Sequence, residues 1–280
     1  MTGAQHLGEA LRLLAHAGVP DAARDARRLL AHALDLSPAR LTLALPDPLP
    51  PEVAERFHAL VARRAAREPV SHLTGRRAFY GRDFHVTPDV LDPRPETETL
   101  IGAALERRFA RVLDLGAGSG CILLTLLAER RQAKGLGTDL SDPALAVAQR
   151  NAAALGLTPR ARFAQGSWWD AVDPEARFDL IVSNPPYIAQ DELPGLAPEV
   201  LDHEPRMALT DDADGLSAYR VLAAGAPRHL AAGGALMVEI GPLQGDAVAG
   251  LFAAAGLCDI AVLPDLDGRS RVVSGRLQAV

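Results

Sequence analysis

Four consecutive residues, Asn184-Pro185-Pro186-Tyr187, can hold a planar amino group. They follow an apolar segment, residues 180–183, that predicts a β-strand. Two prolines fix the backbone and remove two N–H donors, so carbonyl groups and the Asn184 side chain remain as acceptors. Asn184 Oδ1 and a proline carbonyl can accept both hydrogens of an –NH2 group, and Tyr187 can stack on its face. The pattern predicts a rigid, acceptor-rich pocket, and its alternative is a turn that merely ends a strand.

A glycine-rich loop lies upstream, where Gly116-Ala117-Gly118-Ser119-Gly120 follows a predicted strand and opens a predicted helix. Glycines in that context let the backbone turn tightly and approach a ligand. Asp139 ends the next predicted strand, 19 residues after Gly120, where its carboxylate can accept both hydroxyl hydrogens of a ribose. The loop predicts a nucleotide-like cofactor, and without Asp139 it would equally fit an ordinary strand-to-helix turn.

Two better-known glycine motifs do not match this loop. A dinucleotide fingerprint requires glycine or alanine at position 121, where Cys121 stands, and a pyrophosphate-binding P-loop requires a Gly-Lys-Ser or Gly-Lys-Thr sequence that is missing. Trp168 and Trp169 follow a third predicted strand, on the side of the sheet where ligands collect. They are as well explained by core packing as by stacking on an adenine ring.

The elements that position these residues fall into three stretches. Helical spacing of apolar residues predicts a small helical bundle over residues 1–72. Glycines, prolines and aromatic residues predict a hairpin-like linker over 73–95. From residue 111 onward strands alternate with helices, which predicts a mostly parallel sheet covered on both faces, within a catalytic domain of residues 96–280.

The composition of the 280 residues excludes several classes of protein. Hydrophobic residues make up 48% and charged residues 23%, which is typical of a globular chain. The net charge of −6 provides no global positive field for nucleic acid, and no apolar stretch is long enough to span a bilayer. The N-terminus lacks a secretory leader, so we expect a cytoplasmic protein without membrane or direct nucleic-acid contacts. Neither the two distant cysteines nor the histidines form a metal-binding motif, and we expect no metal.

The glycine loop followed by Asn-Pro-Pro-Tyr resembles the S-adenosylmethionine-dependent methyltransferases that modify planar amino groups. More narrowly, the chain resembles the HemK/PrmC family, which methylates the glutamine side-chain nitrogen (N5) in the Gly-Gly-Gln motif of class 1 peptide-chain release factors. Further stretches that carry this resemblance are Phe79-Tyr80-Gly81, Pro93-Arg94-Pro95-Glu96-Thr97-Glu98, Glu204-Pro205, Asp214-Gly215-Leu216 and Glu239-Ile240-Gly241.

The resemblance implies a Rossmann-like methyltransferase fold with an N-terminal helical domain that recognises the substrate. It implies that residues 116–120 wrap S-adenosylmethionine, that Asp139 binds its ribose and that Trp168 lies against its adenine, with S-adenosylhomocysteine as product. Asn184 would contact both the cofactor and the glutamine amide, which residues 184–187 would hold. Asp92, where an aliphatic residue is usual, and Ala117, where threonine is frequent, depart from the family pattern.

Two other functions fit parts of the sequence. An adenine N6-methyltransferase of DNA or RNA would use the same pocket for a flipped base, although the acidic charge and the lack of a basic recognition segment argue against it. A noncatalytic module could retain the cofactor fold and dock a partner through the helical domain, although the intact Asn184, Pro185 and Tyr187 argue against that. The oligomeric state is open.

Overall fold

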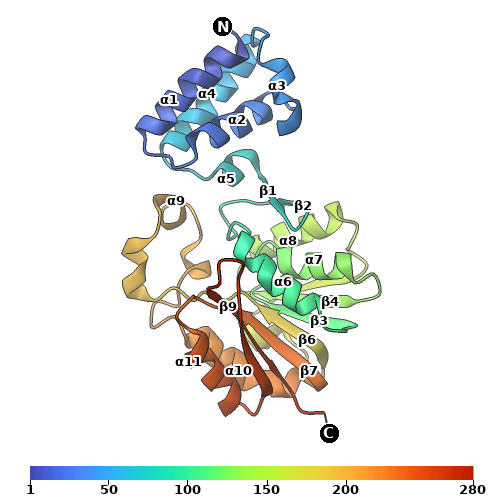
Figure 1. Cartoon of the computed structure of the whole chain (residues 1–280). Helices are drawn as coiled ribbons and strands as arrows, with labels where there is room; N and C mark the ends of the chain where they lie inside the picture. The colour runs from blue at the N-terminus through green and yellow to red at the C-terminus, as the bar shows by residue number, and fades with distance from the viewer. Residues whose placement is uncertain (280) are drawn as a thin grey trace. The chain divides into compact units, whose positions relative to one another are not determined.

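The computed structural model describes residues 1–279, whose contacts divide the chain into two compact units (Figure 1). Unit 1 comprises Met1–Arg76 and Ala197–His203, and unit 2 comprises Arg77–Leu196 and the chain from Glu204 onward. The domain boundaries expected at residues 72 and 95 stay predictions. By contacts, residues 77–95 pack with the catalytic part of the chain.

Unit 1 is a helical bundle around a core of alanine, leucine and valine with one phenylalanine, Phe57. A capping box at Thr2 begins the first helix, and Pro51 occupies the first position of the fourth. Leu14, Leu29 and Leu30 are completely buried between the helices. The helices are α1 (Gly3–His16), α2 (Ala22–Ala33), α3 (Leu41–Ala44), α4 (Pro51–Ala65) and α5 (Val70–Thr74).

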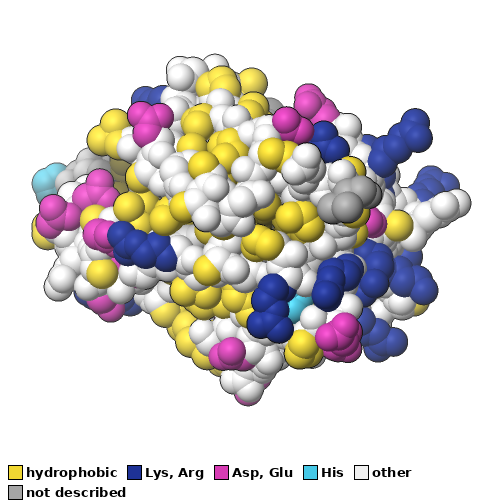
Figure 2. Space-filling view, turned by 90° about the horizontal axis from the view of Figure 1, so that it is seen from below, with side chains coloured by type: hydrophobic (Ala, Val, Ile, Leu, Met, Phe, Trp, Pro, Cys, Tyr) yellow, Lys and Arg dark blue, Asp and Glu magenta, His cyan; other side chains and the backbone are white. Residues whose placement is uncertain are grey.

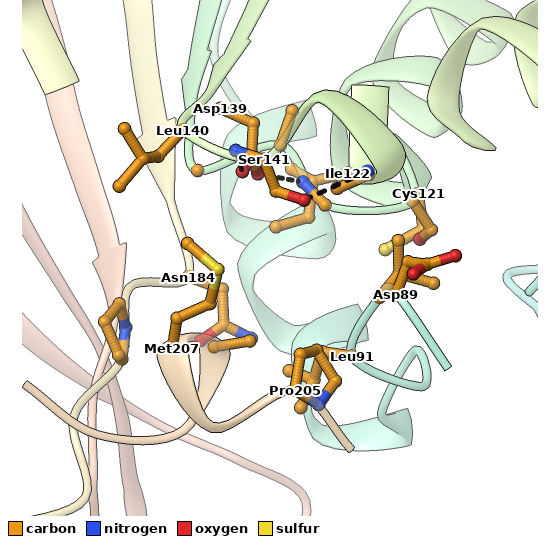
Figure 3. Close-up of a pocket in the computed structure, with 18 of the residues that line it drawn as sticks. Asp89, Leu91, Cys121, Ile122, Asp139, Leu140, Ser141, Asn184, Pro205 and Met207 are labelled. Atoms are coloured by element: carbon orange, nitrogen blue, oxygen red, sulfur yellow. Dashed lines mark hydrogen bonds between the residues drawn. The ribbon is translucent and has the colours of Figure 1, made fainter. Parts of the chain in front are cut away.

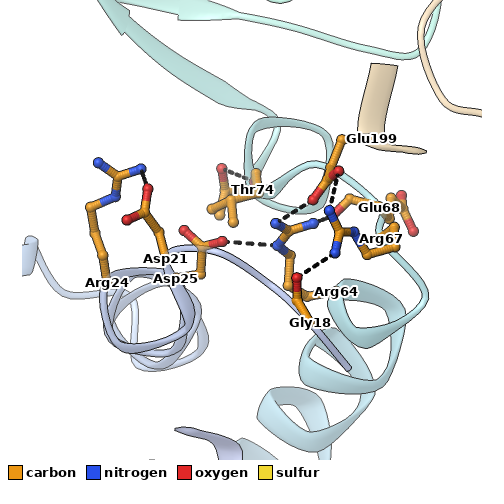
Figure 4. Close-up of polar contacts among 10 residues, drawn as sticks. Gly18, Asp21, Arg24, Asp25, Arg64, Arg67, Glu68, Thr74 and Glu199 are labelled. Atoms are coloured by element: carbon orange, nitrogen blue, oxygen red, sulfur yellow. Dashed lines mark hydrogen bonds and ion pairs between the residues drawn. The ribbon is translucent and has the colours of Figure 1, made fainter. Parts of the chain in front are cut away.

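The short segment Ala197–His203, which contains α9 (Pro198–Leu201), belongs to unit 1 although it is distant in sequence. Glu199 accepts from Arg64 Nη2 at 2.9 Å and from Arg67 Nη2 at 2.7 Å (Figure 4). Arg64 Nε also donates to Asp25 at 2.9 Å, and both of these side chains are buried. Because a buried charge is costly without a partner, this network holds the segment on α2 and α4.

Unit 2 begins with a hairpin of β1 (Arg76–Phe79) and β2 (Arg82–His85). Its turn residues Tyr80 and Gly81 have φ of 47° and 70°. Positive φ at both central positions is the geometry that matches the twist of a two-residue hairpin. The rings of Phe79 and Phe84, 6.0 Å apart, anchor the hairpin to the core of unit 2.

The main sheet has seven strands in the order β5-β4-β3-β6-β7-β9-β8. Neighbouring strands from β5 to β7 pair in parallel, and only β9 runs in the opposite direction, which confirms the predicted mostly parallel sheet. The strands are β3 (Arg111–Leu115), β4 (Lys134–Asp139), β5 (Ala161–Gln165), β6 (Phe178–Ser183), β7 (Leu230–Glu239), β8 (Cys258–Pro264) and β9 (Ser270–Arg276).

Successive residues of a strand point to opposite sides of the sheet, so apolar side chains lie on both faces. Helices cover both of them. Val112 packs in the cluster formed with α6, α7 and α8, whereas Leu113 and Leu115 pack in the cluster formed with α10 and α11 (Figure 1). The helices are α6 (Glu98–Leu105), α7 (Cys121–Glu129), α8 (Asp142–Ala154), α10 (Ser217–His229) and α11 (Gly245–Ala254).

Local sequence patterns do not predict α6 or α10. Helix α10 has no side-chain cap and carries Pro227 inside its last turn, a residue that normally ends a helix. It forms nevertheless, because Tyr219, Leu222 and Ala226 are buried against the sheet. Tertiary packing therefore outweighs the local signal.

The strand order changes direction at β3, which lies between β4 and β6. Asp114 is in register with Val182, so the glycine loop after β3 and Asn184 after β6 leave the sheet side by side. Ser183 Oγ donates to the Leu115 carbonyl at 2.6 Å and fixes the ends of the two strands together. Open α/β sheets bind their ligands at such a switch point.

The surface of the described chain has two plain features. No helix within residues 1–279 combines the length and the apolar composition needed to cross a membrane. On the face shown in Figure 2, acidic, basic and apolar side chains are interspersed, with basic ones gathered toward one side.

Candidate active site

A cavity of about 310 Å³ opens at the switch point, within unit 2 (Figure 3). Loops after β3, β4, β5 and β6 form one part of its wall, and segments 89–97 and 205–212 form the rest. Its volume lies at the lower end of the range typical of small-molecule sites.

Two of the three loop glycines face this cavity. Gly116 and Gly118 have φ of 76° and 52°. A Cβ on Gly116 would have Trp168 as its only near contact, at 3.6 Å, and a Cβ on Gly118 would meet nothing within 4 Å. Gly120, with φ of 77°, is different, because a Cβ there would lie 3.2 Å from Ala148 of α8. The first two glycines leave room for a ligand, and Gly120 permits close helix packing.

Ala117 and Ser119 also line the cavity, so four of the five predicted loop residues lie on its wall and Gly120 does not. Asp114, just before the loop, is fully buried beneath it. Its Oδ2 accepts from the Leu123 backbone N–H at 3.2 Å, while Oδ1 has no partner among the described residues. Burial is the main reason that the pKa of Asp114 is raised to about 7.

Asp139 ends β4 and lines the same cavity. Its Oδ2 accepts from the Gly118 N–H at 2.8 Å, and its Oδ1 accepts from the Ser141 N–H at 2.9 Å. Each carboxylate oxygen keeps a second lone pair. Asp139 therefore fastens the glycine loop and still offers two acceptors at the spacing of a diol.

The two adjacent tryptophans point in different directions. Trp168, with φ of 49°, lines the cavity next to Gly116. Trp169 packs against α10, where its Nε1 donates to the Val221 carbonyl at 2.9 Å. Its ring stacks on that of His229, with the ring centroids 4.9 Å apart. Both tryptophans pack against the core of unit 2, and Trp168 also lines the cavity. Core packing therefore describes Trp169, and stacking on an adenine ring stays a prediction for Trp168.

The Asn-Pro-Pro-Tyr residues also separate. Asn184 and Pro186 line the cavity, and Pro185 and Tyr187 are not among its lining residues. Tyr187 packs with the core beneath α10 and α11, and burial is the main reason that the pKa of its phenol is raised to about 12. Its carbonyl accepts from Gln244 Nε2 at 2.9 Å, which fixes the backbone after the prolines.

Asn184 is oriented by a residue from a distant part of the chain. Its Nδ2 donates to Thr97 Oγ1 at 3.3 Å, and Thr97 belongs to the Pro-Arg-Pro-Glu-Thr-Glu stretch before α6. Since the amide nitrogen is engaged there, the amide oxygen is the free acceptor of the Asn184 side chain. Figure 3 shows Asn184 at the cavity, across from Ser141 and Asp139.

A group of charged residues lies beside the cavity, and the sequence did not predict a role for it. Arg94 Nη2 pairs with the buried Glu204 Oε2 at 2.5 Å, and Arg77 Nη1 lies 3.3 Å from Asp92 Oδ2. Burial is the main reason that the pKa of Glu204 is raised to about 7, and the nearby Asp92 contributes. Asp92, one of the two departures from the family pattern, is thus paired with an arginine. In the sequence, only the Arg94-Pro95 and Glu204-Pro205 pairs, which belong to stretches that carry the family resemblance, pointed to this group.

The cavity residues fit S-adenosylmethionine. Gly116 and Gly118 leave open space for it, Asp139 offers paired acceptors for ribose hydroxyls, and Leu140 and Trp168 add apolar wall. The fold and this site define an S-adenosylmethionine-dependent methyltransferase.

Comparisons with known proteins identify the family. Residues 5–75 match the PrmC N-terminal domain, and residues 92–207 match the methyltransferase small domain. A release factor glutamine methyltransferase of Cereibacter sphaeroides is 62% identical over 279 residues, covering 100% of both chains. The chain therefore belongs to the family of release factor glutamine methyltransferases.

Solved structures agree on the fold. A methyltransferase from Pyrococcus furiosus matches with a TM-score of 0.55 and 17% identity, covering 80% of this chain and 98% of that one. The 16S rRNA N2 G1207 methyltransferase of T. thermophilus, solved in complex with AdoMet and guanosine, matches with a TM-score of 0.53 and 22% identity, covering 72% of this chain and 50% of its own.

Proposed function

We propose that the chain transfers a methyl group from S-adenosylmethionine to the side-chain amide nitrogen of the glutamine in the Gly-Gly-Gln motif of class 1 release factors. Its full-length relative in Cereibacter sphaeroides carries the name of that activity. The observation that carries the proposal is the position of Asn184, which lines the same cavity as Gly116, Gly118 and Asp139 and whose amide nitrogen is engaged by Thr97.

The residues of the cofactor end have distinct roles in this proposal. Asp139 accepts the two ribose hydroxyls through the lone pairs that Gly118 and Ser141 leave free. Trp168, next to Gly116, would stack on the adenine. Together the two residues would hold the nucleoside in one orientation.

The residues of the amide end hold the substrate nitrogen. Asn184 Oδ1 accepts one amide hydrogen, and a carbonyl of the Pro185-Pro186 pair accepts the other. Bound S-adenosylmethionine supplies a methyl group that its sulfonium already activates. An amide nitrogen is a poor nucleophile, so the contribution of the chain is alignment, which can lower the barrier by roughly 7 to 11 kcal/mol. The two acceptors also stabilise the positive charge that develops on the nitrogen.

The helical unit 1 supplies substrate recognition in this proposal, because selecting one glutamine in a whole protein needs contact area beyond the cavity. We also propose a cytoplasmic location, where release factors act. Neither role requires a nucleic-acid contact.

The proposal is tested by incubating the purified chain with radiolabelled S-adenosylmethionine and a purified class 1 release factor. We expect label in the release factor, and none when the motif glutamine is replaced by alanine. Equal labelling of the two release factors would contradict the proposal, as would label that enters only nucleic acid supplied in parallel.

A further inference from the structure

Thr97 has a hydroxyl that its own helix does not use. Thr97 is the last residue of a short 3-10 turn (Pro95–Thr97) that leads directly into α6, and its side chain makes no capping hydrogen bond to that helix. Thr97 is only 2% exposed. A buried hydroxyl without a capping role needs another partner.

Asn184 and Glu239 lie on two sides of this hydroxyl. Asn184 Nδ2 donates to Thr97 Oγ1 at 3.3 Å. The carboxyl of Glu239, the last residue of β7, lies close enough for a hydrogen bond from Thr97 to favour the ionised form and so lower the pKa of Glu239, against the larger effect of burial. An ionised carboxylate can only accept, so the Thr97 hydroxyl donates to Glu239 and has its lone pairs left for Asn184.

The direction of this chain of hydrogen bonds decides how the Asn184 amide is turned. A hydroxyl that already donates its only hydrogen can meet the NH2 group of Asn184 but cannot donate to its oxygen. The NH2 group must therefore face Thr97. The oxygen is left as the free acceptor, and among residues 1–279 no hydrogen-bond donor contacts it.

We propose that Thr97 and Glu239 are positioning residues that hold the Asn184 side chain with its amide oxygen available to the substrate nitrogen. The proposal rests on the proposed function and explains one use of the Pro-Arg-Pro-Glu-Thr-Glu stretch. With the amide turned the other way, Asn184 would present two N–H donors to the donor groups of a substrate amide, and the pair would repel.

The surroundings of Glu239 are consistent with that role. Glu239 is 1% exposed, and its Oε2 has no hydrogen-bond partner among the described residues. Burial is the main reason that its pKa is raised to about 7. A proton on the unpartnered Oε2 would leave the other oxygen free to accept from Thr97, so the orientation is the same in both protonation states.

The first test is kinetic. Thr97→Val preserves shape and removes the hydroxyl, and we expect kcat to fall roughly 10- to 100-fold with the cofactor Kd unchanged, because the reacting nitrogen is misaligned. Thr97→Ser restores the hydroxyl and is expected to recover kcat to within about threefold. Thr125→Val is the matched control, since Thr125 is equally buried in α7 and its Oγ1 has no partner among the described residues. It should leave kcat unchanged.

A double-mutant cycle separates positioning from general damage. In an Asn184→Ala background, Thr97→Val should have no further effect on kcat, because the group that it orients is gone. Additive losses would overturn the proposal, and so would a normal kcat for Thr97→Val or a loss that serine does not restore.

The second test needs no turnover and therefore distinguishes failure of this inference from failure of the proposed function. The sequence contains only two asparagines, Asn151 and Asn184, so labelling asparagine side chains with ¹⁵N gives two amide signals. Asn151 is an internal control, because its Nδ2 donates to the carbonyls of His85 at 3.0 Å and Ser119 at 2.9 Å.

We expect Thr97→Val and Glu239→Leu to speed hydrogen exchange at the Asn184 amide about tenfold and to leave the Asn151 signal unchanged. Glu239→Gln keeps an acceptor oxygen and should stay close to wild type. Unchanged exchange at Asn184 in both variants would overturn the inference. Faster exchange in an enzyme that methylates no release factor would uphold the orientation of Asn184 and reject only the proposed function.

Discussion

The two ends of the cavity are built from different parts of the chain. At the end proposed for the cofactor (the cofactor end), the backbone of the glycine loop forms the wall, and Asp139 accepts from two backbone N–H groups close by in the fold. At the end proposed for the substrate amide (the amide end), Asn184 donates to Thr97, 87 residues away in sequence, which in turn lies beside Glu239. The first end depends on backbone shape, and the second depends on the direction of side-chain hydrogen bonds.

This difference has a consequence for how each end tolerates change. A ligand that binds through many backbone contacts loses part of its affinity when one side chain is altered. A reacting nitrogen held by a few acceptors loses its alignment when one acceptor is removed. We therefore expect changes at the cofactor end to affect binding and changes at the amide end to affect turnover.

The largest effect is expected for Asn184→Ala. Removing one preorganised acceptor should lower kcat at least about 100-fold, while the cofactor Kd changes little. Single-turnover methyl transfer and isothermal titration of the cofactor measure the two quantities. If kcat stays within a few-fold of wild type, Asn184 does not hold the substrate nitrogen.

Asp139→Asn should weaken cofactor binding and leave kcat nearly unchanged, the opposite of Asn184→Ala. It keeps one acceptor oxygen but loses the charge that strengthens hydrogen bonds from ribose hydroxyls, so we expect the cofactor Kd to rise roughly 10-fold. At saturating cofactor, kcat should recover to near wild type. If Asp139→Asn binds the cofactor with normal Kd but has a low kcat, then the two ends of the cavity do not divide binding and turnover between them.

The buried carboxyl beneath the cofactor end predicts a pH dependence of stability. Burial raises the pKa of Asp114 in the folded chain to about 7, above the ordinary aspartate value of 3.8, so folding favours its protonated form. Its stabilising contribution is complete below about pH 4 and is lost as the pH rises toward 7, by about 1.4 kcal/mol per pH unit. Urea unfolding of wild type and Asp114→Asn between pH 5 and 7 isolates this slope, because other buried carboxyls titrate in both proteins. If the unfolding free energies of wild type and Asp114→Asn change in parallel with pH, Asp114 is ionised in the folded chain.

The smallest effect is expected for Gly118→Ala. A residue with a side chain at φ of 52° costs about 1 to 2 kcal/mol of folding stability, and the new methyl would project into the cavity that we propose for the cofactor. Gly81→Ala is the matched control, since it has φ of 70° and open space but lies in the hairpin turn. Both variants should lose similar stability, and only Gly118→Ala should bind the cofactor several-fold more weakly. Equal cofactor affinities would mean that the glycine loop does not form the ligand wall.

The two ends also differ in how far the sequence predicts them. The strand, the glycine loop and Asp139 follow one another within a single βαβ unit, where spacing alone places them together. The sheet and its alternation with helices are predicted for the same reason, and they are confirmed. The contacts of Asn184 with Thr97 and of Arg94 with Glu204 join segments far apart in the chain, and no local pattern encodes such pairs.

The two adjacent tryptophans and the three loop glycines have roles that sequence patterns do not distinguish. Trp168 and Trp169 are neighbours of the same type, and only the positive φ of Trp168 separates the one at the cavity from the one on α10. Gly120 belongs to the same motif as Gly116 and Gly118 but faces α8. In both cases the fold assigns different roles to residues that the motif treats alike.

Fragmentation mass spectrometry of a class 1 release factor, after incubation with this chain and S-adenosylmethionine, tests the proposed reaction and its substrate together. We expect one added methyl group on the side-chain nitrogen of the Gly-Gly-Gln glutamine, and none with the Asn184→Ala variant over the same time. A methyl group on any other residue, or an unmodified glutamine despite measured cofactor binding, would contradict it.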